Sequence, residues 1–391
     1  MNRFGIDEAA LGAELARVLD ELIARPSIYP PGDTGAIAAY AVDQLKAAGC
    51  NAQLAMRTPP FANAFATLGM GKPVVAFNSH ADTIGVGKRE AWRTDPLRGV
   101  VQAGRVHGLG ASNCKGAIAV QLWLAAEIAR RGGPKRGQVQ FAFVADEESL
   151  GDDGSAYLRT SGLSRPDVLV LGAPTENQLI IAERGVMWLR IETFGKAAHA
   201  GMPHQGDSAV SRMVRLITRL ERELGPKLAA RVDGEMRSTL NVGRIHGGDN
   251  INVVPDACVV ELDRRLVPGE TVTAAQAEIE AILKAAGEPA GSVRTERMRG
   301  TDGFKGSPDS PAVTAFRETI QARLGRPARF LTAVGVFDGR FYANDGIEIV
   351  DFGPGAGSEG HAPNESVLIA ELVDAALIQL EVVDRLLGLA R

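Results

Sequence analysis

Three consecutive acidic residues, Asp146, Glu147 and Glu148, are the strongest candidates in this chain for metal binding or acid–base chemistry. They follow the apolar run 139–145, which predicts a buried strand. Neighbouring carboxylates in a low-dielectric environment repel one another and raise one another's pKa values. A cation is therefore expected beside them. Either a metal ion or a group of Lys and Arg side chains would meet this need.

A second polar pair, His80 and Asp82, follows the apolar run 73–78, which is typical of a buried parallel strand. Open α/β sheets place their ligand sites at the carboxyl ends of such strands. Because side chains alternate along a strand, both residues point to one side. Asp82 can then accept a hydrogen bond from one ring nitrogen of His80 while the other nitrogen faces a metal. Taken alone, this spacing is also that of a structural histidine.

The elements that must position these residues follow two different patterns. Helices alternate with apolar strands in the first part of the chain, which indicates a parallel α/β domain. The expected helices there are 9–25, 34–48, 115–131 and 154–161, and the expected strands are 63–68, 73–78, 139–145 and 167–171. From about residue 185, strands are expected at 186–194, 239–245 and 258–266, with helices at 207–224 and 273–286. The α/β pattern returns with helices 312–324 and 363–387 and strand 347–352.

This order predicts a discontinuous α/β domain, residues 1–184 and 300–391, with an α+β domain, residues 185–299, inserted into it. A chain of 391 residues commonly forms two domains. The formal net charge of −4 and the lack of a Lys/Arg block argue against a nucleic-acid partner. Charged residues throughout the first 22 positions argue against a signal peptide or membrane span, so a cytoplasmic protein is expected. The three cysteines have no Cys-x-x-Cys spacing, which supports neither a disulfide framework nor a thiolate zinc site.

Together, in their order and spacing, these motifs resemble the M20 metallopeptidases and deacylases. That family includes acetylornithine deacetylases, succinyl-diaminopimelate desuccinylases and glutamate-releasing carboxypeptidases. The stretches that carry the resemblance are 78–82, 146–148, 196–201, 252–255 and 360–365, and they span nearly the whole chain. The resemblance implies a zinc-peptidase-like catalytic domain with an inserted ferredoxin-like lid, which also forms the dimer interface. A homodimer or larger homo-oligomer is therefore expected.

The resemblance also implies roles for the residues of the catalytic domain. In such enzymes two divalent ions share a bridging carboxylate, and a free glutamate takes a proton from the attacking water. By position, His80 matches the histidine of the first metal, and Asp82 matches the residue that orients it. Glu147 matches the general base, and Glu148 and His361 match ligands of the second metal.

In the inserted domain, His199 resembles the lid histidine that reaches the active site of a neighbouring subunit and stabilises the oxyanion. Arg184, Asn252 and Arg265 fall where members of the family hold a substrate carboxylate. A structural ion pair explains each of these three equally well.

Two ligand positions depart from the family pattern. The bridging aspartate is replaced by Asn113, and a ligating glutamate is replaced by Ala173. Two ions would then be under-neutralised, so one labile ion is expected in place of two. Glu148 and His361 would hold it, with Asn113 or His80 completing a set of donors that suits Mn, Zn, Co or Fe.

The leading hypothesis is a metal-dependent hydrolase in which Glu147 activates water to cleave a C–N bond. The substrate would be a small carboxylate-bearing molecule such as an N-acyl amino acid or a dipeptide-like compound. One alternative within the enzyme class is an aminohydrolase that acts on an aromatic amino acid such as a nitroanthranilate-like compound. A second alternative is a metal-free ligand-binding protein or pseudoenzyme on the same fold.

Overall fold

The computed structural model describes residues 2–333, 335–343 and 345–389, which divide into two compact units. Unit 1 contains Met1–Ile181, Gly306–Leu331 and Phe337–Arg391, and unit 2 contains Ala182–Lys305 and Thr332–Val336. The sequence pattern changes at residues 185 and 300, whereas the units divide after Ile181 and after Lys305. None of the helices in the described residues is both long and apolar enough to cross a membrane.

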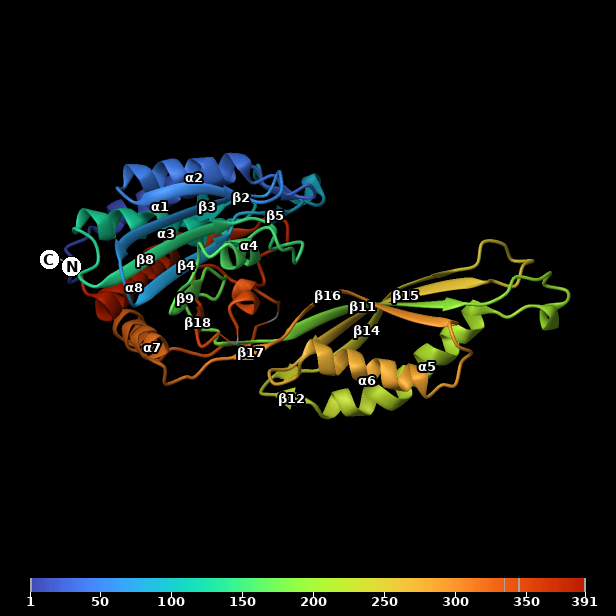
Figure 1. The fold of residues 1–391 in the computed structure, drawn as a ribbon. Helices are drawn as coiled ribbons and strands as arrows, with labels where there is room; N and C mark the ends of the chain where they lie inside the picture. The colour runs from blue at the N-terminus through green and yellow to red at the C-terminus, as the bar shows by residue number, and fades with distance from the viewer. Residues whose placement is uncertain (1, 334, 344, 390–391) are drawn as a thin grey trace. The chain divides into compact units, whose positions relative to one another are not determined.

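Unit 1 is built on a six-stranded sheet (Figure 1). Its strands, in spatial order, are β18 (Glu348–Asp351), β9 (Val168–Leu171), β4 (Val74–His80), β8 (Gly137–Val144), β3 (Ala62–Met70) and β2 (Asn51–Met56). The first four are parallel, and β3 and β2 are antiparallel to their neighbours. His80, the last residue of β4, lies opposite Val144, the last residue of β8. The segments that follow these two strands therefore start side by side.

Helices cover one face of this sheet, and the alternation of side chains decides which residues they contact. Phe141 and Phe143 of β8 belong to the main core, whereas Ala142 and Val144 belong to a smaller core on the opposite face. The main core includes residues of α1 (Glu8–Ile23), α2 (Gly35–Ala47), α3 (Lys115–Arg130), α7 (Pro311–Leu324) and α8 (Ile369–Leu387). The smaller core lies under α4 (Ser155–Thr160).

Short elements complete unit 1. They are β1 (Ile28–Tyr29), β5 (Thr83–Ile84), η1 (Arg89–Ala91), β6 (Val100–Gln102), β7 (Arg105–His107), η3 (Asp338–Phe341) and β19 (Ser366–Leu368). The expected helix 363–387 was wrong at its start, because residues 366–368 pair with β7 and α8 begins only at Ile369. This pairing joins distant parts of the chain, so the local sequence carries no signal for it.

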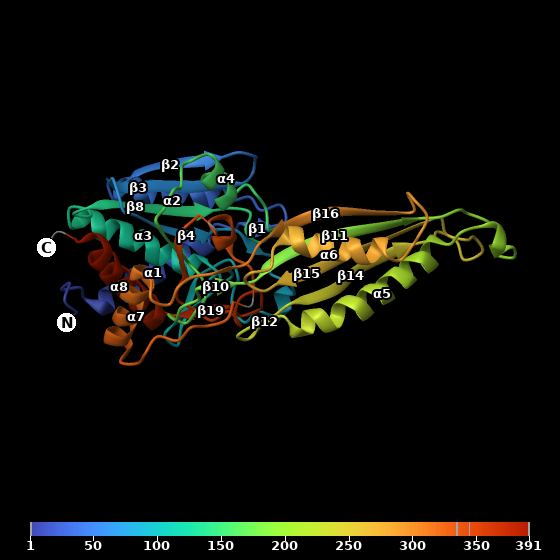
Figure 2. The same ribbon diagram turned by 60° about the horizontal axis from the view of Figure 1, so that its bottom comes forward.

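Unit 2 is a ferredoxin-like α+β fold. Its chain order is β11 (Gly185–Phe194), α5 (Ala209–Ala230), β14 (Thr239–Gly247), β15 (Ala257–Leu266), α6 (Val272–Lys284) and β16 (Val293–Thr301). The strands pair antiparallel in the order β14-β15-β11-β16, which is the arrangement of this βαββαβ motif. Figures 1 and 2 both show α5 and α6 side by side against the sheet. The predicted fold class, an α/β domain with an inserted α+β domain, is confirmed.

Two features of unit 2 were not expected from the sequence. Helix α5 continues through Pro226 to Ala230, although it was expected to end at residue 224. Its buried leucines, which include Leu224 and Leu228, keep the same face against the core beyond the proline. Strand β16 was missed because its residues are mostly exposed and polar. The remaining elements are β10 (Ala182–Glu183), η2 (Pro203–Gln205), β12 (Val232–Asp233), β13 (Met236–Arg237) and β17 (Phe304–Lys305).

Candidate metal and catalytic centre

The carboxyl ends of β4 and β8 bring together three side chains that can bind a metal ion. His80 ends β4, and Glu147 and Glu148 follow β8. One donor atom from each of the three lies within 4.8 Å of the others. The sequence placed these residues at strand ends, and parallel pairing of the two strands accounts for their closeness.

Asp82 connects His80 to Glu148. The Nδ1 atom of His80 lies 2.9 Å from the backbone oxygen of Asp82, whereas the nearest carboxylate oxygen of Asp82 is 3.6 Å away. The ring is thus oriented chiefly by a carbonyl and not by the carboxylate, which differs from expectation. The carboxylate accepts a hydrogen bond from the N–H of Glu148, at 3.0 Å. Asp82 therefore positions both residues.

The other ring nitrogen of His80 faces an acceptor. Because Nδ1 contacts a carbonyl oxygen, it carries the hydrogen of the neutral ring, and Nε2 keeps a lone pair. Nε2 lies 3.2 Å from Oδ1 of Asn113, which also has lone pairs. At this separation a proton on Nε2 joins the two atoms in a hydrogen bond. Burial acts to lower the pKa of His80, but Cys114, Glu147 and Asp82 outweigh burial and raise this pKa well above its usual value, which favours this proton.

The two amide atoms of Asn113 face different residues of the centre: Oδ1 faces His80, and Nδ2 faces Glu148 and His361. Its Nδ2 lies 3.4 Å from Oε1 of Glu148 and 3.2 Å from Nε2 of His361. An amide nitrogen donates hydrogen bonds and has no lone pair for a metal. His361 Nε2 in turn lies 2.7 Å from Oε1 of Glu148, and the hydrogen bond between them raises the pKa of His361. Asn113 thus offers one neutral oxygen where an aspartate would offer two charged ones.

Glu147 is buried, and burial raises its pKa to about 8. His80 acts against this shift, whereas Asp338 and Glu148 add to it. A carboxyl group that titrates near neutral pH is well suited to move protons in catalysis. Sequence reasoning missed Asp338 and its buried ion-pair partner Arg340, whose side chains are 3.3 Å apart. Their burial and their effect on Glu147 mark Asp338 and Arg340 as part of the centre, whereas their spacing in the sequence does not predict this role.

The end of β9 contributes no ligand. Ala173 lies there, buried and without a donor atom. The nearby Glu176 is exposed and lies 3.6 Å from Arg329, so it pairs away from the centre. The charge expected at this position is therefore absent from the described part of the centre.

Four residues considered from the sequence lie in unit 2. His199 and Asn252 occur on adjoining loops, since Ala200 N–H donates to the backbone oxygen of Asn252 at 2.9 Å. The N–H of Gly201 donates to Nδ1 of His199 at 3.0 Å, which leaves the hydrogen of the neutral ring on Nε2.

The other two are Arg184 and Arg265, and the charge of Arg265 acts on Arg184. Burial lowers the pKa of Arg184, and the positive charge of Arg265 lowers it further. Arg265 pairs with Asp263 at 2.8 Å, and Asp263 also accepts a hydrogen bond from Trp188. Arg265 is thus part of a structural ion pair, while its charge still reaches Arg184.

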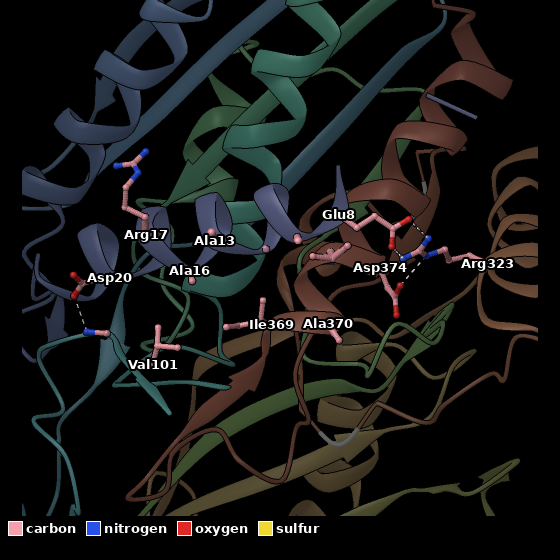
Figure 3. Close-up of a pocket in the computed structure, with 14 residues that line it drawn as sticks. Glu8, Ala13, Ala16, Arg17, Asp20, Val101, Arg323, Ile369, Ala370 and Asp374 are labelled. Atoms are coloured by element: carbon pink, nitrogen blue, oxygen red, sulfur yellow. Dashed lines mark hydrogen bonds and ion pairs between the residues drawn. The ribbon is translucent and has the colours of Figure 1, made fainter. Parts of the chain in front are cut away.

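A cavity of about 830 Å³ lies elsewhere in unit 1, between α1 and the start of α8. Figure 3 shows small residues such as Ala13, Ala16 and Ala370 along it, with charged groups at its ends. Arg323 lies 2.6 Å from Glu8 and 2.7 Å from Asp374, so one positive charge is shared between two carboxylates. None of the metal-centre residues lines this cavity.

Comparison with known proteins assigns the family. Residues 181–290 match the peptidase dimerisation domain of M20 proteins. The chain is 30% identical to a succinyl-diaminopimelate desuccinylase of Methylobacterium radiotolerans, and the alignment covers 94% of this chain and 95% of that protein. It shares its fold with a tripeptidase from Staphylococcus aureus, with a TM-score of 0.77, 24% identity and 95% and 97% of the two chains covered. It also resembles a dinuclear metal-binding M20 peptidase from Bacillus subtilis, with a TM-score of 0.71, 16% identity and 97% and 99% covered.

The desuccinylase alignment extends over almost the whole of both chains, and the dimerisation domain coincides with unit 2. The chain therefore belongs to the M20 family of metallopeptidases and deacylases and is an enzyme of the metal-dependent amide hydrolase class.

Proposed function

We propose that this enzyme cleaves the amide bond of a small carboxylate-bearing substrate, an N-acyl amino acid or a dipeptide-like molecule. It would use a single divalent metal ion, with Glu147 as the general base. The observation that carries the proposal is the cluster formed by His80, Glu147 and Glu148, whose donor atoms lie within 4.8 Å of one another.

The donors in the centre suit one divalent transition-metal ion by their type, although His361 lies outside the group of His80, Glu147 and Glu148 whose donor atoms are within 4.8 Å of one another. His80 Nε2, a Glu148 oxygen and His361 Nε2 would hold it, with Oδ1 of Asn113 as a neutral fourth donor. Imidazole and carboxylate ligands of this kind suit Zn, Mn, Co or Fe. Two ions would bring four positive charges to ligand positions that supply one carboxylate, Glu148. Their mutual repulsion therefore argues for one ion, held weakly.

A bound divalent ion in such a site lowers the pKa of water and polarises the amide carbonyl. Glu147 would then take a proton from the attacking water and deliver it to the amide nitrogen as the C–N bond breaks. With its pKa raised to about 8, Glu147 can hold the proton between these two transfers, and the charge of a bound cation would favour the ionised form that must first accept it. Asp82 would keep His80 and Glu148 in place throughout.

The residues of unit 2 would contribute substrate contacts. The hydrogen that His199 keeps on Nε2 makes this atom a donor suited to an oxyanion, as the family resemblance implies. Arg184 and Arg265 bring two positive charges close together, and burial together with the charge of Arg265 lowers the pKa of Arg184. Together with Asn252, they are our candidates for holding the substrate carboxylate. We further propose a cytoplasmic homodimer or larger homo-oligomer, formed through the domain that matches residues 181–290.

The metal-free ligand-binding protein considered from the sequence is disfavoured, because the chain belongs to a family of metal-dependent hydrolases. The buried Ala173 and the neutral amide of Asn113 are the features that would suit such a protein. An aminohydrolase for aromatic amino acids is the alternative within the enzyme class, since altered ligands can accompany altered chemistry.

One experiment separates these proposals. The purified protein would be reconstituted with manganese, zinc, cobalt or iron and assayed on N-acyl amino acids, dipeptides and aminobenzoates, beside a Glu147→Gln variant. Turnover of amides that depends on metal and on Glu147 supports the hydrolase. Turnover confined to aminobenzoates supports the aminohydrolase. No turnover with any metal, together with no uptake of divalent ions, supports the binding protein.

A further inference from the structure

The buried carboxylate of Glu365 accepts three backbone hydrogen bonds from a single turn. Oε1 accepts from the N–H groups of Ser112 and Asn113, at 2.9 and 2.8 Å, and Oε2 accepts from the N–H of Gly110, at 2.9 Å. The side chain is only 2% exposed. Within residues 2–333, 335–343 and 345–389, these N–H groups have no second acceptor. Glu365 therefore satisfies three donors that would otherwise be buried without a partner.

This contact joins two segments that both reach the candidate metal centre. The turn carries Asn113, whose amide lies 3.2 Å from both His80 and His361. Glu365 lies four residues after His361 in the same loop, yet 252 residues after Asn113. His361 itself has a φ of +62°, an uncommon conformation for a residue with a side chain, which persists only when its surroundings hold it. Glu365 thus ties the turn that carries Asn113 to the loop that carries His361.

Burial raises the pKa of Glu365, whereas the three backbone N–H donors favour its carboxylate form. The turn leads directly into α3 (Lys115–Arg130), and the N-terminal end of a helix favours negative charge. The buried amino group of Lys115 donates to the backbone oxygen of Arg25 at 3.1 Å, and burial lowers its pKa to about 7 against the opposing effect of Glu365. A glutamine would keep one acceptor oxygen but would turn an NH₂ group toward backbone N–H donors.

We propose that Glu365 is a positioning residue of the metal centre, which holds Asn113 and His361 at the separation needed to bind an ion. The inference rests on the proposed function, because it assumes that this centre binds a metal. Glu365 contacts neither the ion nor the substrate and acts through the turn. Replacing a residue that contacts a metal ligand but not the metal typically lowers metal affinity about 10- to 100-fold.

The test compares the metal affinities of full-length variants. Zn²⁺ and Mn²⁺ binding would be measured by competition with a chromophoric chelator for the natural protein, Glu365→Gln, Glu365→Ala and Glu359→Gln. Glu359 is the matched control, since it lies in the same loop but pairs with Arg105 and Ser366 and not with the turn. Both Glu365 variants are expected to bind about 10- to 100-fold more weakly, and Glu359→Gln is expected to bind normally.

Chemical rescue distinguishes positioning from general damage. Formate can occupy the space that Glu365→Ala leaves and accept the same N–H groups, so it should restore part of the lost metal affinity. It should have no effect on the Glu359→Gln variant. If Glu365→Ala does not fold, the isosteric Glu365→Gln, with folding checked by circular dichroism, provides the comparison.

The possible failures are distinct. Equal affinities of the natural protein and the folded Glu365 variants would overturn the positioning role and leave the proposed function intact. Weakened binding in Glu359→Gln to the same extent would also overturn it, because the effect would then belong to the loop as a whole. A natural protein that binds neither ion would contradict the proposed function, and the inference would fall with it.

Discussion

Nε2 of His361 and Oε1 of Glu148 lie 2.7 Å apart, although 213 residues separate them in the chain. Glu148 is nearly buried, with 6% of its side chain exposed, whereas the side chain of His361 is 50% exposed. The contact raises the pKa of His361, so the proton on this ring and a metal ion compete for the same nitrogen.

Metal affinity should therefore depend on pH in a predictable direction. Below the raised pKa of His361 the ring is protonated, and its pairing with Glu148 stabilises the ion-free fold. As the pH rises through that pKa, the pairing is lost and the nitrogen becomes free to bind the ion. We expect affinity to increase with pH above 6.5, the ordinary pKa of histidine, and to level off only when both His361 and His80, whose pKa values are raised, have lost their protons. Chelator competition across this range measures the effect, and His361→Gln should remove much of the slope.

Glu147→Gln should abolish turnover while leaving metal binding largely unchanged. The amide keeps the size of the side chain but cannot accept the proton of water, and loss of a general base typically costs about 100- to 10,000-fold in rate. Steady-state kinetics and metal titration of the same preparation provide the two measurements.

Glu176→Gln is a suitable control for Glu147→Gln because Glu176 is exposed and pairs with Arg329. Its turnover should match that of the natural protein. An equal loss in both variants would show that Glu147 has no special role.

Asn113→Asp should tighten metal binding. The substitution replaces a neutral oxygen with a charged one beside His80 and Glu148, and attraction between a carboxylate and a divalent ion at this range amounts to several kcal/mol, on the order of 100-fold in affinity. Elemental analysis would report whether one or two ions bind. A second ion should bind firmly only when Ala173→Glu is added. Unchanged affinity in Asn113→Asp would argue that the ion does not contact this residue.

The ion pair between Glu8 and Arg323 should contribute to stability above acidic pH. The hydrogen bond to Arg323 lowers the pKa of Glu8 from 4.5 to about 2. A lowered carboxyl pKa stabilises the fold above pH 4.5, and this contribution is lost as the pH falls toward 2. Because the Glu8 side chain is 40% exposed, Glu8→Gln should cost less than about 1 kcal/mol at pH 7.

Urea unfolding of the natural protein and Glu8→Gln at pH 7, 4 and 2 checks this expectation. The difference between the two proteins should shrink as the pH decreases. A difference that stays constant down to pH 2 would mean that the carboxylate of Glu8 is not its source.

Local patterns account for most of the architecture. The apolar runs that became β4 and β8 could be recognised from the sequence, because strands buried on both faces need apolar residues at nearly every position. The confirmed fold class follows from the order of such segments. Strand β19 could not be predicted, because its stability comes from pairing with β7. The same holds for β16, whose exposed polar residues carry no hydrophobic pattern.

By itself, the sequence determined the family, the order of the elements and the chemical character of the centre. Asn113 and Ala173 already showed that the centre lacks two of the carboxylates typical of the family, because the charge of a side chain follows from its residue type. Only the tertiary structure decided how these groups meet. It placed the carbonyl of Asp82 against His80, buried Asp338 and Arg340 beside Glu147, and joined Glu365 to the turn of Asn113. Contacts of this kind depend on distances between distant segments, and those distances arise only when the chain packs.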